Sequence, residues 1–306
     1  LSSWSPVSSG VPQGSVLGPL FFLVYINDLP NEIHHSNIYM LADDCKIFRT
    51  IRSTTDSLLL QKDLDNIYNW TQTWQLPLNI QKCTTVHIRN KLNHPAQQYK
   101  LGHHKLKESP QERDLGVIIT KTLKSSHHCT AIINKARSII HSIFFCFSTR
   151  NPKLLTDIFK TYVRPILEYA SPVWNPHLIK DISAIEKVQR KFTRRLTGLN
   201  DISYQERLKA CNLPSLQSRR TFLDLIQVYK IIHGHPKLKI NDFFELSRST
   251  TTRGHHLKLL TPHCRTTERL NSFAIRTIIP WNNLPEEIVS APTIQKFKRL
   301  LSAHLL

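Results

Sequence analysis

Asn37-Ile38-Tyr39-Met40-Leu41-Ala42-Asp43-Asp44-Cys45-Lys46-Ile47-Phe48 is the stretch that decides the fold. Two short apolar runs, 37–41 and 45–48, flank a pair of adjacent carboxylates. This pattern predicts an antiparallel β-hairpin with Asp43 and Asp44 at its turn. Aspartate is also a favoured turn residue in proteins without any catalytic role. Two carboxylates would be costly to bury unpaired, and a divalent cation would offset that cost because hard cations bind carboxylate oxygens.

Helices and further strands surround this hairpin. A loop with glycine and proline at 10–18 leads into an apolar segment, 19–27, which predicts a helix with Pro19 in its first turn. Ser53 predicts the N-cap of a helix that runs to about Trp74. We expect strands at 86–88 and 115–119.

From about Ser125 onward the pattern is almost wholly helical. Asn151 and Pro152 predict an N-cap followed by proline at the first helical position, and Ser203 with Glu206 predicts a capping box. Two more amphipathic helices are expected at 214–233 and 293–306, and the segment 236–285 is the least regular. Strands and helices in the first part followed by helices in the second predict an α+β fold.

The charge balance narrows the class of partner. The chain has 306 residues, and 41 lysines and arginines against 22 acidic residues give a formal net charge of +19. Such an excess favours a polyanion, most often nucleic acid, over an anionic membrane surface, while charge kept for solubility is the plainer alternative. The longest apolar run, 16–26, contains a glycine and a proline and is too short to span a bilayer, so we expect no membrane association.

Part of the positive charge falls on one predicted helix. Lys187, Arg190, Lys191, Arg194 and Arg195 follow helical spacing along one stripe, and Ile185, Val188, Phe192 and Leu196 lie on the other side. A basic stripe of this kind suits contacts to a phosphate backbone, which supply affinity without reading sequence. A solvated helix face is the alternative interpretation.

The cysteines and histidines indicate no metal framework. Six cysteines are scattered without a C-x-x-C pair, so neither a disulfide scaffold nor a zinc ribbon is predicted. His255, His256, His263 and Cys264 cluster loosely, but their spacing matches no pattern of zinc ligands.

Four segments in a fixed order carry a family resemblance. Pro12-Gln13-Gly14-Ser15-Val16-Leu17-Gly18-Pro19 resembles motif B of the reverse transcriptases of jockey-like non-LTR retrotransposons. Leu41-Ala42-Asp43-Asp44 resembles motif C, with leucine in place of the usual aromatic residue. Trp74–Lys82 resembles motif D, and Arg113-Asp114-Leu115-Gly116-Val117 resembles motif E, the primer grip. The helical region that follows the polymerase core in these elements is similar to 162–170, 185–190, 204–208 and 281–285.

The resemblance implies a fold and a domain organisation. It implies part of a right-hand polymerase palm at 1–122, an all-α thumb at 123–235 and a helical C-terminal extension at 236–306. The intact parent would be an RNA-directed DNA polymerase that binds an RNA template, a DNA primer and deoxynucleoside triphosphates, and that uses two Mg²⁺ ions, with Mn²⁺ as a possible substitute.

The resemblance also implies roles for particular residues. Asp43 and Asp44 would bind metal, and Lys82 would lie near the triphosphate. Gln13, Gly14 and Ser15 would line the nascent base pair, beside an open groove to which at least one of the two aspartates is exposed. Leu115 and Gly116 would position the primer terminus, and the stripe at 187–195 would contact nucleic acid.

Catalysis needs one more carboxylate. The first metal-binding aspartate of the family precedes motif B, so we expect this chain to begin after it and to be inactive alone. A non-catalytic nucleic-acid-binding remnant is therefore the alternative from a different functional class. A group II intron maturase is a third hypothesis, and the helices after the palm argue against it.

Overall fold

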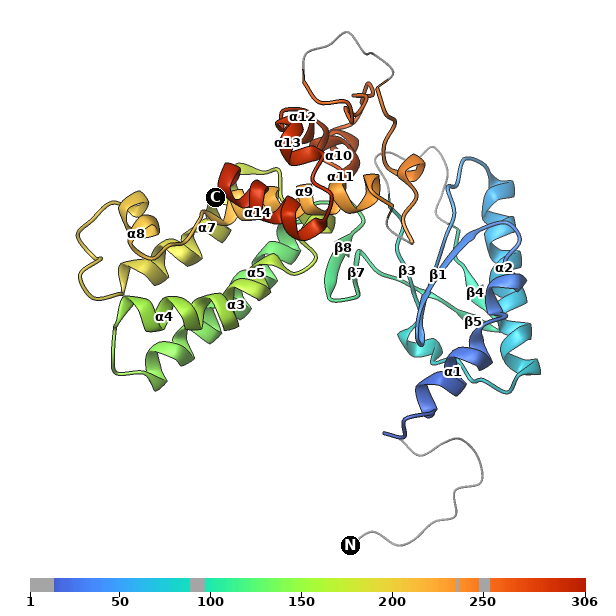
Figure 1. Ribbon diagram of the computed structural model, residues 1–306. Coiled ribbons are helices and arrows are strands. Elements are labelled where there is room, and N and C mark those ends of the chain that lie inside the picture. Colours follow the sequence, from blue (N-terminus) through green and yellow to red (C-terminus); the bar gives the residue numbers. More distant parts are fainter. Residues whose placement is uncertain (1–13, 89–96, 235–236, 248–253) are drawn as a thin grey trace, which may run out of the picture. The chain divides into compact units, whose positions relative to one another are not determined.

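The computed structural model describes residues 14–88, 97–234, 237–247 and 254–306. The chain divides into two compact units, one up to Glu112 and the other from Arg113 onward. Small two-stranded sheets and helices make up the first unit, and helices dominate the second (Figure 1). This mixture agrees with the predicted α+β class. The finer division into palm, thumb and extension stays a prediction.

The first unit contains two α-helices and six short strands among its described residues. Its helices are α1 (Gly18–Ile26) and α2 (Thr54–Thr73), with 3-10 turns at η1 (Leu29–Glu32) and η2 (Ile80–Lys82). The strands β1 (Asn37–Leu41) and β2 (Asp44–Phe48) pair antiparallel. β3 (Thr84–Thr85) pairs in parallel with β6 (Lys107–Glu108), and β4 (Lys100–Leu101) pairs antiparallel with β5 (His104–Lys105). β7 (Gln111–Asp114) lies at the boundary of the units.

Helix α2 organises the core of this unit. Ser53 and Asp56 form the capping box that starts the helix, and Arg49 adds an ion pair to Asp56 at 2.8 Å. Trp70 and Ile67 pack on Ile26 at the end of α1, whereas further along the helix Leu64 packs in a second cluster with Tyr99, Leu101 and Leu106. The predicted helix at 53–74 is confirmed, because its cap and its apolar spacing are local features.

The second unit begins with a hairpin and continues as helices. Its elements, with the π-turn η3 and the 3-10 turn η4, are β8 (Val117–Thr120), α3 (Ser126–Cys146), α4 (Pro152–Ile158), η3 (Phe159–Val163), α5 (Arg164–Glu168), α6 (Ser171–Trp174), α7 (Ile179–Arg194), α8 (Tyr204–Ala210), α9 (Leu216–Ile232), η4 (Ile240–Asp242), α10 (Thr267–Leu270), α11 (Phe273–Arg276), α12 (Ile278–Asn282), α13 (Glu286–Val289) and α14 (Ile294–Leu305). The N-caps predicted at Asn151 and Ser203 are confirmed.

Two apolar clusters fill the second unit. The first lies among α3, α4, α5 and α7 and includes Phe159 and Phe192, whose rings stack at 4.6 Å. The second lies among α9, α12 and α14, where Phe297 stacks on Tyr229 at 4.2 Å. Arg219 donates two hydrogen bonds to Glu168, at 2.8 and 2.7 Å, and so ties α9 to the end of α5.

Two local expectations about strands need correction. The strand expected at 86–88 is β3 at 84–85 instead, because pairing with β6 sets its position. The strand expected at 115–119 begins only at Val117, since Leu115 and Gly116 form the turn that joins β7 to β8. The segment 236–285, expected to be the least regular, contains the short helices α10 to α12 among its described residues, which agrees with the expectation.

Candidate functional site

The β1–β2 turn presents the two candidate metal ligands. Leu41 pairs with Asp44 in the register, so Ala42 and Asp43 form the turn, and Asp44 opens β2. The hairpin prediction is confirmed. Ala42 adopts a left-handed backbone with φ of 52°, a region that costs a residue with a Cβ roughly 1–2 kcal/mol. Strain of this kind at a tight turn is a feature of functional sites as well as of simple hairpins.

Asp43 and Asp44 are both exposed, which agrees with the prediction that at least one of them would be. The two charges are therefore not buried, and no metal is needed to offset such a cost. The carboxylates still fit Mg²⁺. This ion keeps several waters and uses one or two carboxylates together with substrate phosphates. Across the described residues, no group of three or more histidine, cysteine, aspartate or glutamate side chains lies in a metal-binding arrangement.

The two faces of the hairpin differ. Ile38, Met40 and Ile47 pack on the core of the first unit. On the other face Tyr39, 67% exposed, stacks on Phe48 at 5.4 Å, and Leu41 is 59% exposed. Leu41, where the resembling family has an aromatic residue, thus lies on the same outward face, next to the turn that carries the aspartates.

The predicted nucleotide loop is described only in part. Gln13 lies outside the described residues, so the groove expected beside 13–15 remains a prediction. Gly14 has φ of 87°, and a Cβ there would meet no atom of the described residues within 4 Å, so on that side its backbone is open to approach. Ser15 has a structural task, because its hydroxyl accepts a hydrogen bond from the Gly18 backbone N–H at 3.1 Å, at the start of α1.

The remaining predicted contacts are Lys82, Leu115 and Gly116. Lys82 is exposed at the end of η2. Leu115 and Gly116 form the β7–β8 turn with φ of 45° and 85°, two consecutive left-handed residues as in a tight hairpin turn. Leu115 is 48% exposed, and its carbonyl accepts a hydrogen bond from the Tyr169 hydroxyl at 3.0 Å. The sequence did not predict this contact, which joins residues far apart in the chain.

Helix α7 carries the predicted basic stripe. All five basic residues are exposed, and Ile185, Val188, Phe192 and Leu196 are buried on the opposite side, so the two-faced helix is confirmed. Two of the arginines also pack within the fold. The Arg190 guanidinium lies 4.8 Å from the Tyr204 ring centre, and that of Arg195 lies 3.8 Å from the Phe144 ring centre. The stripe is thus partly structural, which spacing alone could not indicate.

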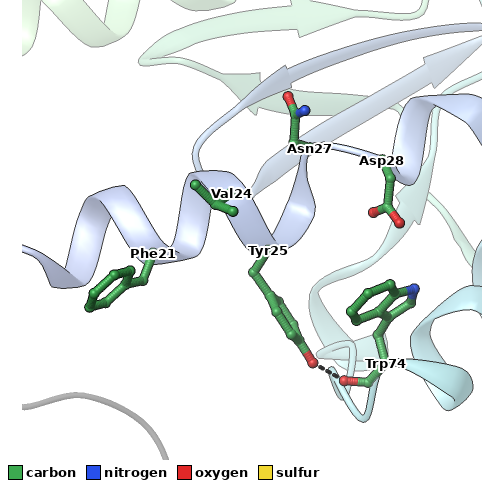
Figure 2. A pocket seen from close by; sticks show the side chains of 6 residues that line it. All are labelled: Phe21, Val24, Tyr25, Asn27, Asp28 and Trp74. Carbon is green, nitrogen blue, oxygen red and sulfur yellow. Dashed lines mark hydrogen bonds between the residues drawn. The ribbon is translucent and has the colours of Figure 1, made fainter.

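A shallow hollow of about 350 Å³ lies between α1 and the end of α2 (Figure 2). Phe21, Tyr25, Asp28 and Trp74 line it, and the Tyr25 hydroxyl donates to the Trp74 carbonyl. The rings of Tyr25 and Trp74 meet edge to face at 5.5 Å. None of these residues was a predicted site residue. Trp74 is the first residue of the segment resembling motif D, and Phe21 follows shortly after the segment resembling motif B.

Helices able to cross a bilayer are absent from the described part of the chain, since none combines the required length with low polarity.

Comparison with known proteins indicates the class. Residues 1–119 match the model of the reverse transcriptase (RNA-dependent DNA polymerase) family. The chain is 27% identical over 210 residues to the RNA-directed DNA polymerase from mobile element jockey of Drosophila melanogaster, and 28% identical over 210 residues to that of Drosophila funebris. It is 27% identical over 206 residues to the probable RNA-directed DNA polymerase from transposon X-element of Drosophila melanogaster.

These matches cover 64 to 65% of this chain but 23% of each relative. The chain is therefore related to the polymerases of non-LTR retrotransposons and spans about a quarter of their length. No solved structure matches it.

Proposed function

We propose that this chain is part of an RNA-directed DNA polymerase that copies retrotransposon RNA by two-metal nucleotidyl transfer. One observation carries the proposal. Within the segment that matches the reverse transcriptase family, Asp43 and Asp44 stand exposed at the turn of an antiparallel hairpin whose other face packs on the core. Carboxylates at such an exposed turn can bind a cation that keeps most of its water ligands.

The residues have distinct tasks in this proposal. Asp43 and Asp44 hold Mg²⁺, which when bound supplies activation of the primer 3′ hydroxyl and stabilisation of the departing pyrophosphate. The Lys82 ammonium neutralises triphosphate charge from the end of η2. The open backbone at Gly14 lets the nucleotide approach closely, with Gln13 and Ser15 on either side. The Leu115–Gly116 turn positions the primer terminus.

Template and primer are held by charge. The exposed basic face of α7, with Lys187, Lys191 and Arg194 free of ring contacts, tracks phosphates of the RNA–DNA hybrid. This binding needs nothing from the hairpin. The same face therefore also favours the second candidate function, a nucleic-acid-binding protein without catalysis.

Primer extension distinguishes the two functions. A two-metal site takes carboxylates from two motifs, and Asp43 and Asp44 supply only one, so residues 1–306 alone should not extend a primed RNA template with Mg²⁺ or Mn²⁺. A longer polypeptide that carries a further metal-binding aspartate ahead of residue 1 should extend it. Asp43→Ala should abolish that extension.

The matched control is Asp65→Ala, which removes an exposed carboxylate from α2 and should leave extension unchanged. Extension by residues 1–306 would show that the carboxylate set is complete. An active Asp43→Ala variant of the longer polypeptide would overturn the metal assignment, and failure of the longer wild type would favour the binding protein.

A further inference from the structure

A residue far along the chain, in the second unit, forms a hydrogen bond with the β7–β8 turn. The Tyr169 hydroxyl, at the end of α5, donates to the Leu115 carbonyl at 3.0 Å. The ring of Tyr169 also packs on the turn, because a Cβ at Gly116 would lie 3.4 Å from one of its edge carbons. Leu115 adopts a left-handed conformation that leucine rarely adopts, so this turn needs outside support to keep its shape.

Tyr169 is itself fixed through its main chain. Its backbone N–H donates to the Pro165 carbonyl at 2.9 Å, and its carbonyl accepts from the Trp174 indole at 2.7 Å. Because both bonds use main-chain atoms of Tyr169, they set the position of the phenol without depending on its hydroxyl.

The contacts continue back to the same hairpin. The Trp174 ring lies 4.9 Å from the buried ring of His128, whose Nδ1 accepts from the Ile118 backbone N–H in β8 at 3.3 Å. Two side chains therefore form hydrogen bonds with the β7–β8 hairpin: Tyr169 at its turn and His128 in β8. Trp174 links the two residues.

The turn is exposed although it is firmly held. Leu115 is 48% exposed and Tyr169 is 58% exposed. Val173, four residues after Tyr169, is 65% exposed. An apolar side chain on a rigid, strained turn is poor for solubility but suits contact with a flat apolar surface. The end of a base-paired duplex offers such a surface.

We propose that Tyr169 is a positioning residue, which fixes the β7–β8 turn so that Leu115 meets the terminal base pair of the primer. This inference rests on the proposed function, since it takes the Leu115–Gly116 turn as the contact to the primer terminus. Tyr169 acts through the turn. The phenol hydroxyl is the group that matters, because it donates the hydrogen bond to the Leu115 carbonyl.

Hydrogen exchange of the chain without nucleic acid tests whether the Tyr169 hydroxyl stabilises the β7–β8 turn. Tyr169→Phe keeps the ring and removes one hydrogen bond, so amides in 114–118 should exchange roughly two- to tenfold faster, while those of α7 and α9 stay unchanged. Tyr162→Phe is the matched control. Tyr162 is 62% exposed and its hydroxyl has no hydrogen-bond partner among the described residues. Unchanged exchange at 114–118 in Tyr169→Phe would overturn the proposal.

Photo-cross-linking tests the positioning. A primer whose 3′-terminal base is a photoreactive thiouridine, annealed to RNA, should cross-link to residues within 113–118 of the wild-type chain. In Tyr169→Phe this cross-link should fall several-fold, while the affinity for the hybrid, measured by fluorescence anisotropy, stays unchanged. Full cross-linking despite faster exchange would show that the Tyr169–Leu115 hydrogen bond stabilises the fold but does not position the primer. That result would overturn the proposal.

Failure of this inference can be told apart from failure of the proposed function. If wild-type chain does not bind the hybrid, the proposed function fails and the role of Tyr169 falls with it. If it binds and cross-links only outside 113–118, the polymerase assignment can stand while the role of Tyr169 is overturned.

Discussion

At the scale of single residues, Ala42 is one position whose backbone conformation does not suit its residue type. Its φ of 52° is one that glycine adopts freely and alanine does not. We predict that Ala42→Gly stabilises the hairpin by about 1 kcal/mol, since the strain removed exceeds the extra entropy that glycine has in the unfolded chain. Urea unfolding of the two proteins measures this difference.

The same position separates strain from function. If the strain only reflects a tight turn, Ala42→Gly should leave extension by the longer polypeptide unchanged. If the alanine orients Asp43, extension should fall although stability rises. A less stable Ala42→Gly variant would contradict the prediction, because it would mean that the left-handed backbone at residue 42 carries no strain that glycine relieves.

Residues with local signals were predicted and residues with distant partners were not. Ser53, Asn151 and Ser203 were identified as caps because a cap depends on the next three residues. The exposure of the aspartates was predicted because the turn of a hairpin is a local feature. The Tyr169–Leu115 hydrogen bond was missed because it depends on the packing of residues far apart in the chain.

At the scale of elements, the basic face of α7 makes a prediction about salt. Because Arg190 and Arg195 pack on rings, the variant that isolates binding is Lys187→Gln, Lys191→Gln and Arg194→Gln together. If these side chains neutralise phosphates, the slope of log affinity against log salt should become less steep. The expected change is about 0.9 for each phosphate that the variant no longer neutralises on B-form DNA, with a similar trend on hybrids.

A charge-matched control lies on α14. Replacing the exposed residues Lys296, Lys298 and Arg299 by glutamine removes the same charge from a different helix. Fluorescence anisotropy across a salt series compares the two triple variants. Equal slopes for both would mean that α7 acts only through net charge and that its face is simply solvated.

Helix α3 carries a titratable residue whose protonation opposes folding. Burial lowers the pKa of His128 below its ordinary value, with a smaller contribution from Arg113. The unfolded chain therefore binds a proton more readily, and stability should fall as pH drops from about 6.5 toward the lowered pKa of the folded state. Protonation would also put a proton on Nδ1, which now accepts from Ile118.

His128→Asn tests this account, because its side-chain oxygen can replace Nδ1 as acceptor and does not titrate. We expect urea unfolding at pH 7.5 and 5.5 to show a smaller acid loss in His128→Asn than in wild type. Burial also lowers the pKa of His255, so some acid loss should remain. His141→Asn, at an exposed position of α3, should behave as wild type. An acid loss in His128→Asn equal to that of wild type would contradict the prediction.

At the scale of the whole molecule, the two largest clusters of buried apolar side chains both lie in the second unit. Phe297 is fully buried and packs between Tyr229 and Trp281, so Phe297→Ala should cost about 3–5 kcal/mol of the unfolding free energy of this unit. Phe145→Ala, at a side chain 84% exposed, should change it by less than about 0.5 kcal/mol. Hydrogen exchange of α9 amides under increasing urea measures both, and similar losses would mean that this cluster is not the core.

The fold class and the family could be predicted from the sequence, but the architecture could be predicted only in part. Apolar periodicity and N-caps identify each helix from its own residues, so the sequence was enough to predict that the second unit is mainly helical. The short strands β3 to β6 have almost no pattern of their own and exist through pairing. The short helices α10 to α12 were missed because they are shorter than the repeat that periodicity needs.

The hairpin that carries the aspartates has one more consequence, for the behaviour of the protein in solution. Among the described strands, β1 and β2 pair only with each other, so each has an outer edge that no other described strand covers, and Tyr39, Leu41 and Phe48 are exposed beside them. Open edges of this kind can template intermolecular strand pairing, and the net charge of +19 opposes it by keeping copies apart. Salt would screen that repulsion, so the conditions that release the protein from nucleic acid should also promote its aggregation.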